Sequence, residues 1–155
     1  EALFRSDAYL AGCDAVVGWR RPGHGGEDGR VRTAGAGPAT AEELFAGRPA
    51  ALEIRRRVLE ILSAYPDVEE RVQRSQLAYG RTHGFAYLWL PDQYLGHADA
   101  EVVLTVALDR EDPSPRWKQV VHPSPRHWVH HLELDEAREI DDEAVAWLHE
   151  AADRA

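Results

Sequence analysis

Histidines are concentrated in residues 122–133, and these side chains are the ones most able to do chemistry. On a strand, alternate residues share a face, so His127, His131 and Glu133 are expected together and His130 on the opposite face. Two imidazoles and a carboxylate on one face are the beginning of a zinc site, with an ordinary polar sheet face as the alternative. No further ligand is evident on a neighbouring segment. The sequence therefore predicts no metal and no other cofactor.

His130 falls on the apolar face of this segment and is expected to be buried. A buried neutral imidazole needs partners for both ring nitrogens, and Tyr79 or Ser75 from an earlier segment could serve. Because the pKa of histidine lies near neutrality, His130 and His131 are also candidates for a general base. A core histidine with satisfied hydrogen bonds and a catalytic base both remain open.

The tetrapeptide Pro-Ser-Pro-Arg occurs twice, at residues 113–116 and 123–126, each time just before a segment that contains tryptophan. The prolines stiffen these turns and restrict the orientation of each arginine. Two such guanidiniums could bind a carboxylate or a phosphate. Neighbouring antiparallel strands begin at opposite ends of a sheet, however, and this favours a structural role in the turns over a joint site.

Aromatic and basic side chains on the strand-like segments are the best candidates for ligand binding. They are Tyr87, Trp89, Arg116, Trp117 and His131. No set of nucleophile, base and orienting group can be assembled from the sequence. We therefore expect a non-enzymatic binding module for a small ligand or a partner protein. The alternative is a small hydrolase or transferase that uses a histidine base on the sheet.

These side chains must be positioned by a sheet, because the middle of the chain consists of strand-like segments. They are Val68–Val72, Gln76–Gly80, Phe85–Leu90, Glu101–Asp109, Trp117–His122 and Trp128–Leu134. Since no helix separates these segments, the sheet is expected to be antiparallel, with about five strands.

Helices are predicted on both sides of this region. Thr40 and Glu43 form a capping box, and Pro49 suits the first turn of a longer helix. Asp141 can cap a final helix, whose apolar stripe is centred on Leu148. The fold class is therefore α+β, an antiparallel sheet flanked by N-terminal and C-terminal helices. We expect residues 39–155 to form this domain and residues 1–38 to be an N-terminal arm or a long-looped hairpin.

Five segments carry a resemblance to a known family: Thr40–Gly47, Val68–Phe85, Asp112–Arg116, His130–Leu134 and Ile140–Glu143. Over residues 40–155 the chain resembles an uncharacterised bacterial family, domain of unknown function 5655. This resemblance implies a helix-flanked antiparallel sheet and a bacterial cytoplasmic setting, and it implies no reaction.

The first residues carry a second, local resemblance. Residues 1–17, beginning Glu1-Ala2-Leu3-Phe4-Arg5, are similar to the opening of alanyl-tRNA editing proteins. Those hydrolases bind zinc through histidines and a cysteine on later segments. Cys13 is the single cysteine of this chain, so the editing activity is not expected.

Composition narrows the class of partner. With 18 basic and 27 acidic residues, the 155-residue chain has a formal net charge of −9. Such a charge disfavours binding to nucleic acid and to anionic membranes, because both depend on lysine and arginine. No apolar run approaches the ~20 residues of a membrane span. A single cysteine is typical of a reducing compartment, so we expect a cytoplasmic protein that binds neither nucleic acid nor membrane.

Overall fold

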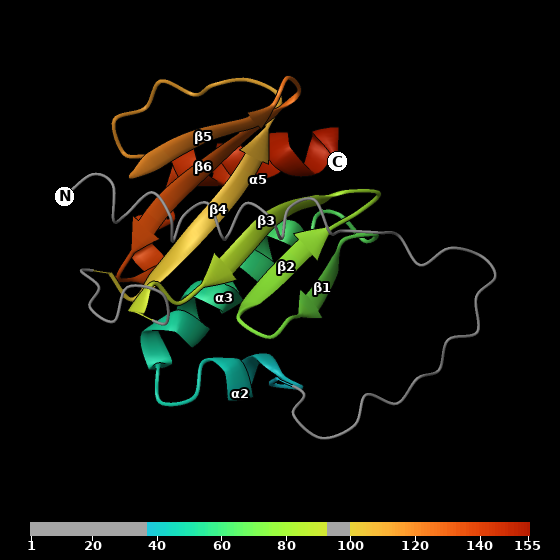
Figure 1. Ribbon diagram of the computed structural model, residues 1–155. Helices are drawn as coiled ribbons and strands as arrows, with labels where there is room; N and C mark the ends of the chain where they lie inside the picture. The colour runs from blue at the N-terminus through green and yellow to red at the C-terminus, as the bar shows by residue number, and fades with distance from the viewer. Residues whose placement is uncertain (1–36, 93–99) are drawn as a thin grey trace.

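The structure is a computed structural model that describes residues 37–92 and 100–155. Its centre is one six-stranded antiparallel sheet, with helices packed against it (Figure 1). The strands are β1 (Glu69–Val72), β2 (Gln76–Gly80), β3 (Gly84–Trp89), β4 (Val102–Leu108), β5 (Gln119–Ser124) and β6 (His127–Leu134). The helices are α2 (Ala41–Leu44), α3 (Pro49–Leu62), the short 3₁₀ helix η1 (Ala137–Glu139) and α5 (Asp142–Arg154). The predicted α+β class is confirmed, and the sheet has six strands instead of about five.

The order of strands in the sheet is β1-β2-β3-β4-β6-β5. The first four strands are neighbours in sequence order, as is common for antiparallel strands, and short turns link β1 to β2 and β2 to β3. After β4 the chain forms β5 at the edge of the sheet. It then turns back as β6, which lies between β4 and β5 and pairs with both. Pro123 lies within β5, where a residue without an N–H group is tolerated because an edge strand pairs on one side only.

The sequence signals for the helix ends are present in the structure. The Thr40 hydroxyl accepts a hydrogen bond from the Glu43 backbone at 3.1 Å, and Pro49 opens α3. The Asp141 carboxylate accepts from the Ala144 backbone at 3.2 Å and caps α5. Each cap satisfies a backbone N–H group that the first turn of a helix leaves free.

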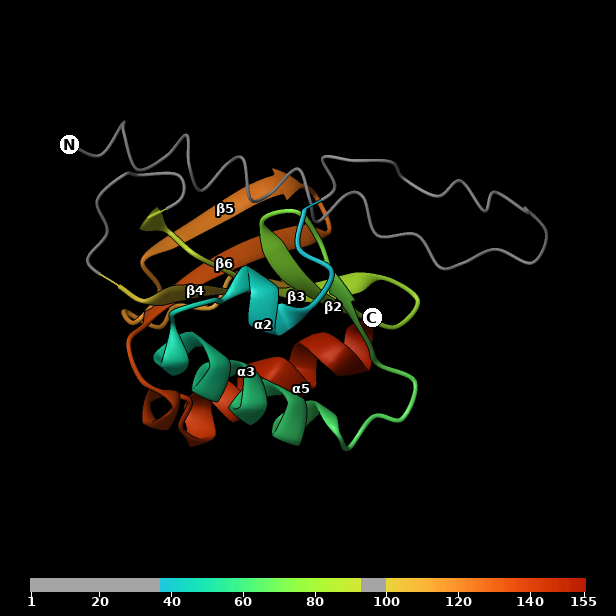
Figure 2. The same ribbon diagram turned by 90° about the horizontal axis from the view of Figure 1, so that it is seen from below.

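Helices α3 and α5 lie side by side against one face of the sheet (Figure 2). This helix face carries the main core, to which α2, α3 and α5 all contribute. Leu148 of α5 is fully buried there, as its position in the apolar stripe predicts. None of the described helices has the length and apolar character needed to span a bilayer.

The opposite side of the sheet, which we call the second face, is also buried. Ala78, Tyr87, Trp89 and Val103 form a separate apolar cluster on it. No residue of the described helices belongs to that cluster. His131 shares this face and has no exposed surface, so the expectation of an ordinary polar sheet face there is wrong. The sequence prediction failed because alternation assigns a residue to a face and cannot tell whether that face meets water.

The predicted arm or hairpin at the N-terminus, residues 1–38, lies outside the described residues except for its last two positions.

Candidate functional site

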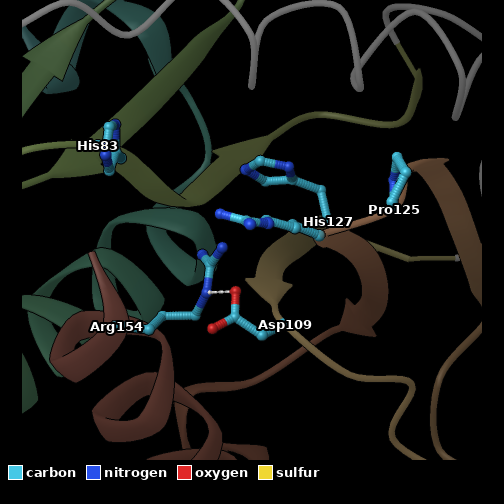
Figure 3. Close-up of a pocket in the computed structure, with 6 residues that line it drawn as sticks. His83, Asp109, Pro125, His127 and Arg154 are labelled. Carbon is cyan, nitrogen blue, oxygen red and sulfur yellow. Dashed lines mark hydrogen bonds and ion pairs between the residues drawn. The ribbon is translucent and has the colours of Figure 1, made fainter.

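A cavity of about 570 Å³ opens at one end of the sheet, and it is the candidate site of this molecule (Figure 3). Four parts of the described structure supply its lining: the β2–β3 turn, the end of β4, the β5–β6 turn and the last turn of α5. The lining residues, which we call the end pocket, are His83, Asp109, Pro125, Arg126, His127 and Arg154.

Strand register brings these residues together. Leu108 of β4 is paired with Trp128 of β6, so the next position of the ladder sets Asp109 opposite His127. Ser124 pairs with His127, which leaves Pro125 and the residue after it as a two-residue turn between β5 and β6. A short turn with a fixed proline φ holds this edge of the pocket in place.

The opposite wall is fixed by an ion pair. Arg154 Nε lies 2.5 Å from Asp109 Oδ1, and a second nitrogen of the same guanidinium donates to the Ala107 carbonyl at 3.2 Å. Figure 3 shows this pair beside His127, with His83 approaching from another segment. Arg154 also lies in the last turn of α5, where a positive charge is favourable to the helix dipole. The pair therefore ties the end of α5 to the sheet.

His127 is held by a hydrogen bond between its Nδ1 and the Ser124 hydroxyl, at 2.8 Å. Burial, followed by the positive charge of Arg154, lowers the pKa of His127 below its ordinary value. The imidazole is therefore neutral at pH 7, with one nitrogen able to donate and one able to accept.

Arg126 differs from most arginines of the chain. Within residues 37–92 and 100–155, no carboxylate forms an ion pair with it, whereas Arg55, Arg81, Arg110 and Arg116 all have such partners. The end pocket thus holds two guanidiniums and one carboxylate. Its excess charge is positive in a chain whose formal net charge is −9.

Three of the residues predicted to bind a ligand lie together, but on the second face. The indole of Trp89 donates to the Thr105 hydroxyl at 2.9 Å, and that hydroxyl lies 2.8 Å from His131 Nδ1. The rings of Trp89 and His131 meet edge to face at 6.1 Å. Burial lowers the pKa of His131 to about 3, so this imidazole stays neutral across the physiological range.

Tyr87 is the third of these residues, and its hydroxyl differs from the polar groups of Trp89 and His131. Its hydroxyl is buried and has no hydrogen-bond partner among the residues that the structure describes. Burial raises the pKa of Tyr87 well above its ordinary value, so the hydroxyl keeps its proton.

Arg116 and Trp117 lie on the helix face, so the five predicted ligand-binding residues do not form one site. Arg116 pairs with Asp141 at 2.8 Å and with Glu143 at 3.0 Å. The Trp117 ring packs against Trp147 of α5 with ring centroids 4.0 Å apart. These contacts hold the β4–β5 connection against α5. They give the first Pro-Ser-Pro-Arg turn its structural role.

His130 is a core histidine with both nitrogens satisfied. Its Nε2 accepts a hydrogen bond from the Asp112 backbone N–H at 3.0 Å, and Nδ1 donates to the Trp128 carbonyl at 3.1 Å. These two groups replace Tyr79 and Ser75, the partners considered from the sequence. Since Nε2 already accepts, this imidazole has no free lone pair with which to act as a base.

Sequence reasoning missed most of the end pocket. His83, Asp109 and Arg154 belong to segments far apart in the chain, and nothing in their local spacing sets them apart. Arg126 and His127 were considered, but for a joint arginine site and for zinc. Among the described residues, no three His, Cys, Asp or Glu side chains gather as a metal centre would need.

One comparison with known proteins identifies a family. The model of one family, described as Domain of unknown function (DUF5655), matches residues 41–154. No curated protein and no solved structure matches the chain. The similarity of residues 1–17 to alanyl-tRNA editing proteins finds no support in these comparisons, and those residues lie outside the described ones. The match covers well over half of the sequence, and the chain therefore belongs to the DUF5655 family.

Proposed function

We propose that this domain is a non-enzymatic binding module whose end pocket holds a small anionic ligand, a carboxylate or a phosphate. The observation that carries the proposal is the guanidinium of Arg126, which has no carboxylate partner in the described part of the chain and lines a cavity. Guanidinium groups bind carboxylates and phosphates through two parallel hydrogen bonds.

The chemistry around Arg126 favours the same class of ligand. Arg154 shares its charge with Asp109, yet its guanidinium also lines the pocket. His127 and His83 add imidazole nitrogens that can donate hydrogen bonds to an anion. The volume of about 570 Å³ lies in the usual range for small-molecule sites.

A binding role is favoured over catalysis by the composition of the lining. The six lining side chains include no serine, threonine, cysteine or lysine that could attack a substrate. The histidines first considered as bases, His130 and His131, are buried away from the pocket.

One observation favours a small hydrolase as the second candidate. The hydroxyl of Ser124 lies 2.8 Å from His127 Nδ1, and the neutral imidazole is able to accept a proton. In that case Ser124 would be the nucleophile and His127 the base. A substrate would then have to reach a hydroxyl that is not itself part of the lining.

The proposal extends to the setting of the protein. We propose a bacterial cytoplasmic protein with a small molecule or a partner protein as its ligand, and with no role in binding nucleic acid or membrane. The net charge of −9 and the single cysteine support this setting.

Calorimetric titration of the full chain with inorganic phosphate, and separately with succinate, tests the anion site. We expect saturable binding of at least one anion, weakened ~10-fold or more by Arg126→Ala, since a hydrogen bond to a charged group contributes about 1.5–3 kcal/mol. Arg56→Ala is the matched control, because it removes the same charge from an exposed position of α3. Equal affinities in the two variants, or no saturable binding of either anion to the parent, would contradict the proposal.

A turnover assay with p-nitrophenyl phosphate and p-nitrophenyl acetate distinguishes the hydrolase from the binding module. A binding module gives no turnover above buffer. Hydrolysis that disappears in both Ser124→Ala and His127→Gln would favour the second candidate.

A further inference from the structure

The second face of the sheet is closed off from water, although no described helix lies on it. Its large aromatic residues, Tyr87 and Trp89, are each 1% exposed, and Thr105 and His131 are equally buried. Helices α2, α3 and α5 all contribute to the core on the opposite side (Figure 2). Side chains of one sheet layer shield each other sideways but cannot cover one another from above. A further layer of chain is therefore needed on this face.

The chemistry of the second face specifies what that layer must provide. The cluster around Trp89 is apolar, so its cover must bring apolar side chains. The buried hydroxyl of Tyr87 lacks a partner among the described residues, and a buried hydroxyl without a hydrogen bond is destabilising. A backbone carbonyl of the covering segment would satisfy it.

We propose that residues 2–19 of the same chain pack over the second face. The chain enters the described structure at the right place for this. A Cβ atom on Gly37 would lie 2.9 Å from the Cα of Arg74, so Gly37 packs directly against the β1–β2 turn. Two residues after Arg74, Gln76 lies on the second face and is paired with Trp89. Residues 1–36 therefore connect to the described structure at the border of the second face.

Composition identifies the part of the segment that does the covering. Between Arg20 and Ala36 the only large apolar side chain is Val31, and the stretch is rich in glycine and charge. Residues 2–19 carry the apolar side chains that the face needs: Leu3, Phe4, Tyr9, Leu10, Val16, Val17 and Trp19. The chain between residues 19 and 37 can extend up to roughly 60 Å. That reach exceeds the width of the sheet, whose strands lie ~4.8 Å apart.

A nitroxide label on Cys13, the single cysteine, tests the proposal in the full chain. Tryptophan indole N–H signals in NMR spectra report on the two sides of the sheet. Trp89 lies on the second face, whereas Trp117 and Trp147 lie on the helix face. We expect the label to remove the Trp89 signal and to leave those of Trp117 and Trp147. A label at Ser6→Cys in a Cys13→Ser background should do the same, which guards against one label site disturbing the packing.

Two controls distinguish the occupants. Spin-labelled chains without isotope, mixed with isotope-labelled chains without spin label, should leave the Trp89 signal intact; its loss there would mean that a second copy covers the face. Leu10→Asp should restore the Trp89 signal in the labelled chain, whereas Ala34→Asp, with the same charge change in the polar stretch, should not. A Trp89 signal that survives both label positions would overturn the proposal.

Discussion

At the scale of single residues, the histidines show how burial decides chemistry. His127, His130 and His131 all have a pKa lowered below the ordinary value, and in each case burial is the largest cause. Of these three, His127 is the one that lines the end pocket. All three imidazoles are therefore favoured in the neutral form. They differ in position, and His127 is the one that a ligand in the end pocket would meet.

The free energy of unfolding should fall as the pH is lowered from 7.5 to 5.5, because of His131. The unfolded imidazole takes up a proton near its ordinary pKa of 6.5, whereas the folded one resists protonation until about pH 3. Protons therefore favour the unfolded state across this window. This histidine alone accounts for a loss of about 1.4 kcal/mol over those two pH units. Urea unfolding at both pH values measures it.

The same comparison in His131→Gln should give a difference smaller by about that amount. His122→Gln, an exposed histidine on the edge strand, is the control and should leave the difference unchanged. Parallel pH dependence in His131→Gln and the parent would mean that this imidazole is not buried in the neutral form.

Glu70 is the charged residue whose removal should cost most on the outer strands. Its carboxylate accepts from both Arg55 Nε, at 3.0 Å, and a second guanidinium nitrogen, at 2.7 Å. The buried Tyr79 hydroxyl donates to it at 2.8 Å. Glu70→Ala leaves the Arg55 guanidinium and the Tyr79 hydroxyl without their acceptor, so we expect a loss of ~2 kcal/mol in the free energy of unfolding. Its exposed neighbour Glu69 has Arg71 as its one ion-pair partner among the described residues, and Glu69→Ala should cost less than about 0.5 kcal/mol. Equal costs in urea unfolding would contradict this account.

At the scale of elements, α5 joins the main core to the end pocket. Ala144, Leu148 and Ala151 face the sheet, and their small or compact side chains allow close packing. The last turn of the same helix supplies Arg154 to the pocket. Loss of helix docking is therefore expected to disturb the pocket as well as the core.

Leu148→Ala should lower the free energy of unfolding by ~2–5 kcal/mol, the range for a fully buried leucine. Ala146→Ser, exposed on the same helix, should change it by about 0.5 kcal/mol or less. Asp153 is exposed but is not a neutral control, because it accepts a hydrogen bond from the Tyr65 hydroxyl at 2.8 Å. Matching midpoints for Leu148→Ala and Ala146→Ser in urea would mean that α5 is not docked.

The helices and strands were the part of this structure that the sequence predicted best. All six strand-like segments form strands, and the caps at Thr40 and Asp141 are in place, because alternation, capping and turn residues are local signals. The position of β6 between β4 and β5 was not predicted, since strand order depends on contacts between distant segments. The same dependence explains why Arg116 and His131, assigned to one site, lie on opposite faces.

At the scale of the whole molecule, one sheet separates two environments. The helix face is filled by described residues, and the second face is buried without a described layer. The end pocket lies where strand ends, a turn and a helix end meet. Such a meeting point could not be predicted from the sequence, because His83 and Arg154 come together only through the packing of α5 on the sheet.

Limited digestion of the full chain with trypsin checks the boundary between the two parts of the sequence. The stretch from Arg20 to Arg30 is rich in glycine and polar residues, a composition that proteases prefer, so the first cuts are expected after Arg20, Arg21 or Arg30. Arginines of the folded domain should resist, because most of them are held in ion pairs with neighbouring elements. Examples are Arg55 of α3, which pairs with Glu70 of β1, and Arg81 in the turn after β2, which pairs with Asp67. Arg116 is held in the same way against α5. Mass spectrometry of the early products measures the order of cutting. Rapid cleavage within Thr40–Leu62 would contradict a domain that begins near residue 39, because α2 and α3 would then not be held in the folded domain.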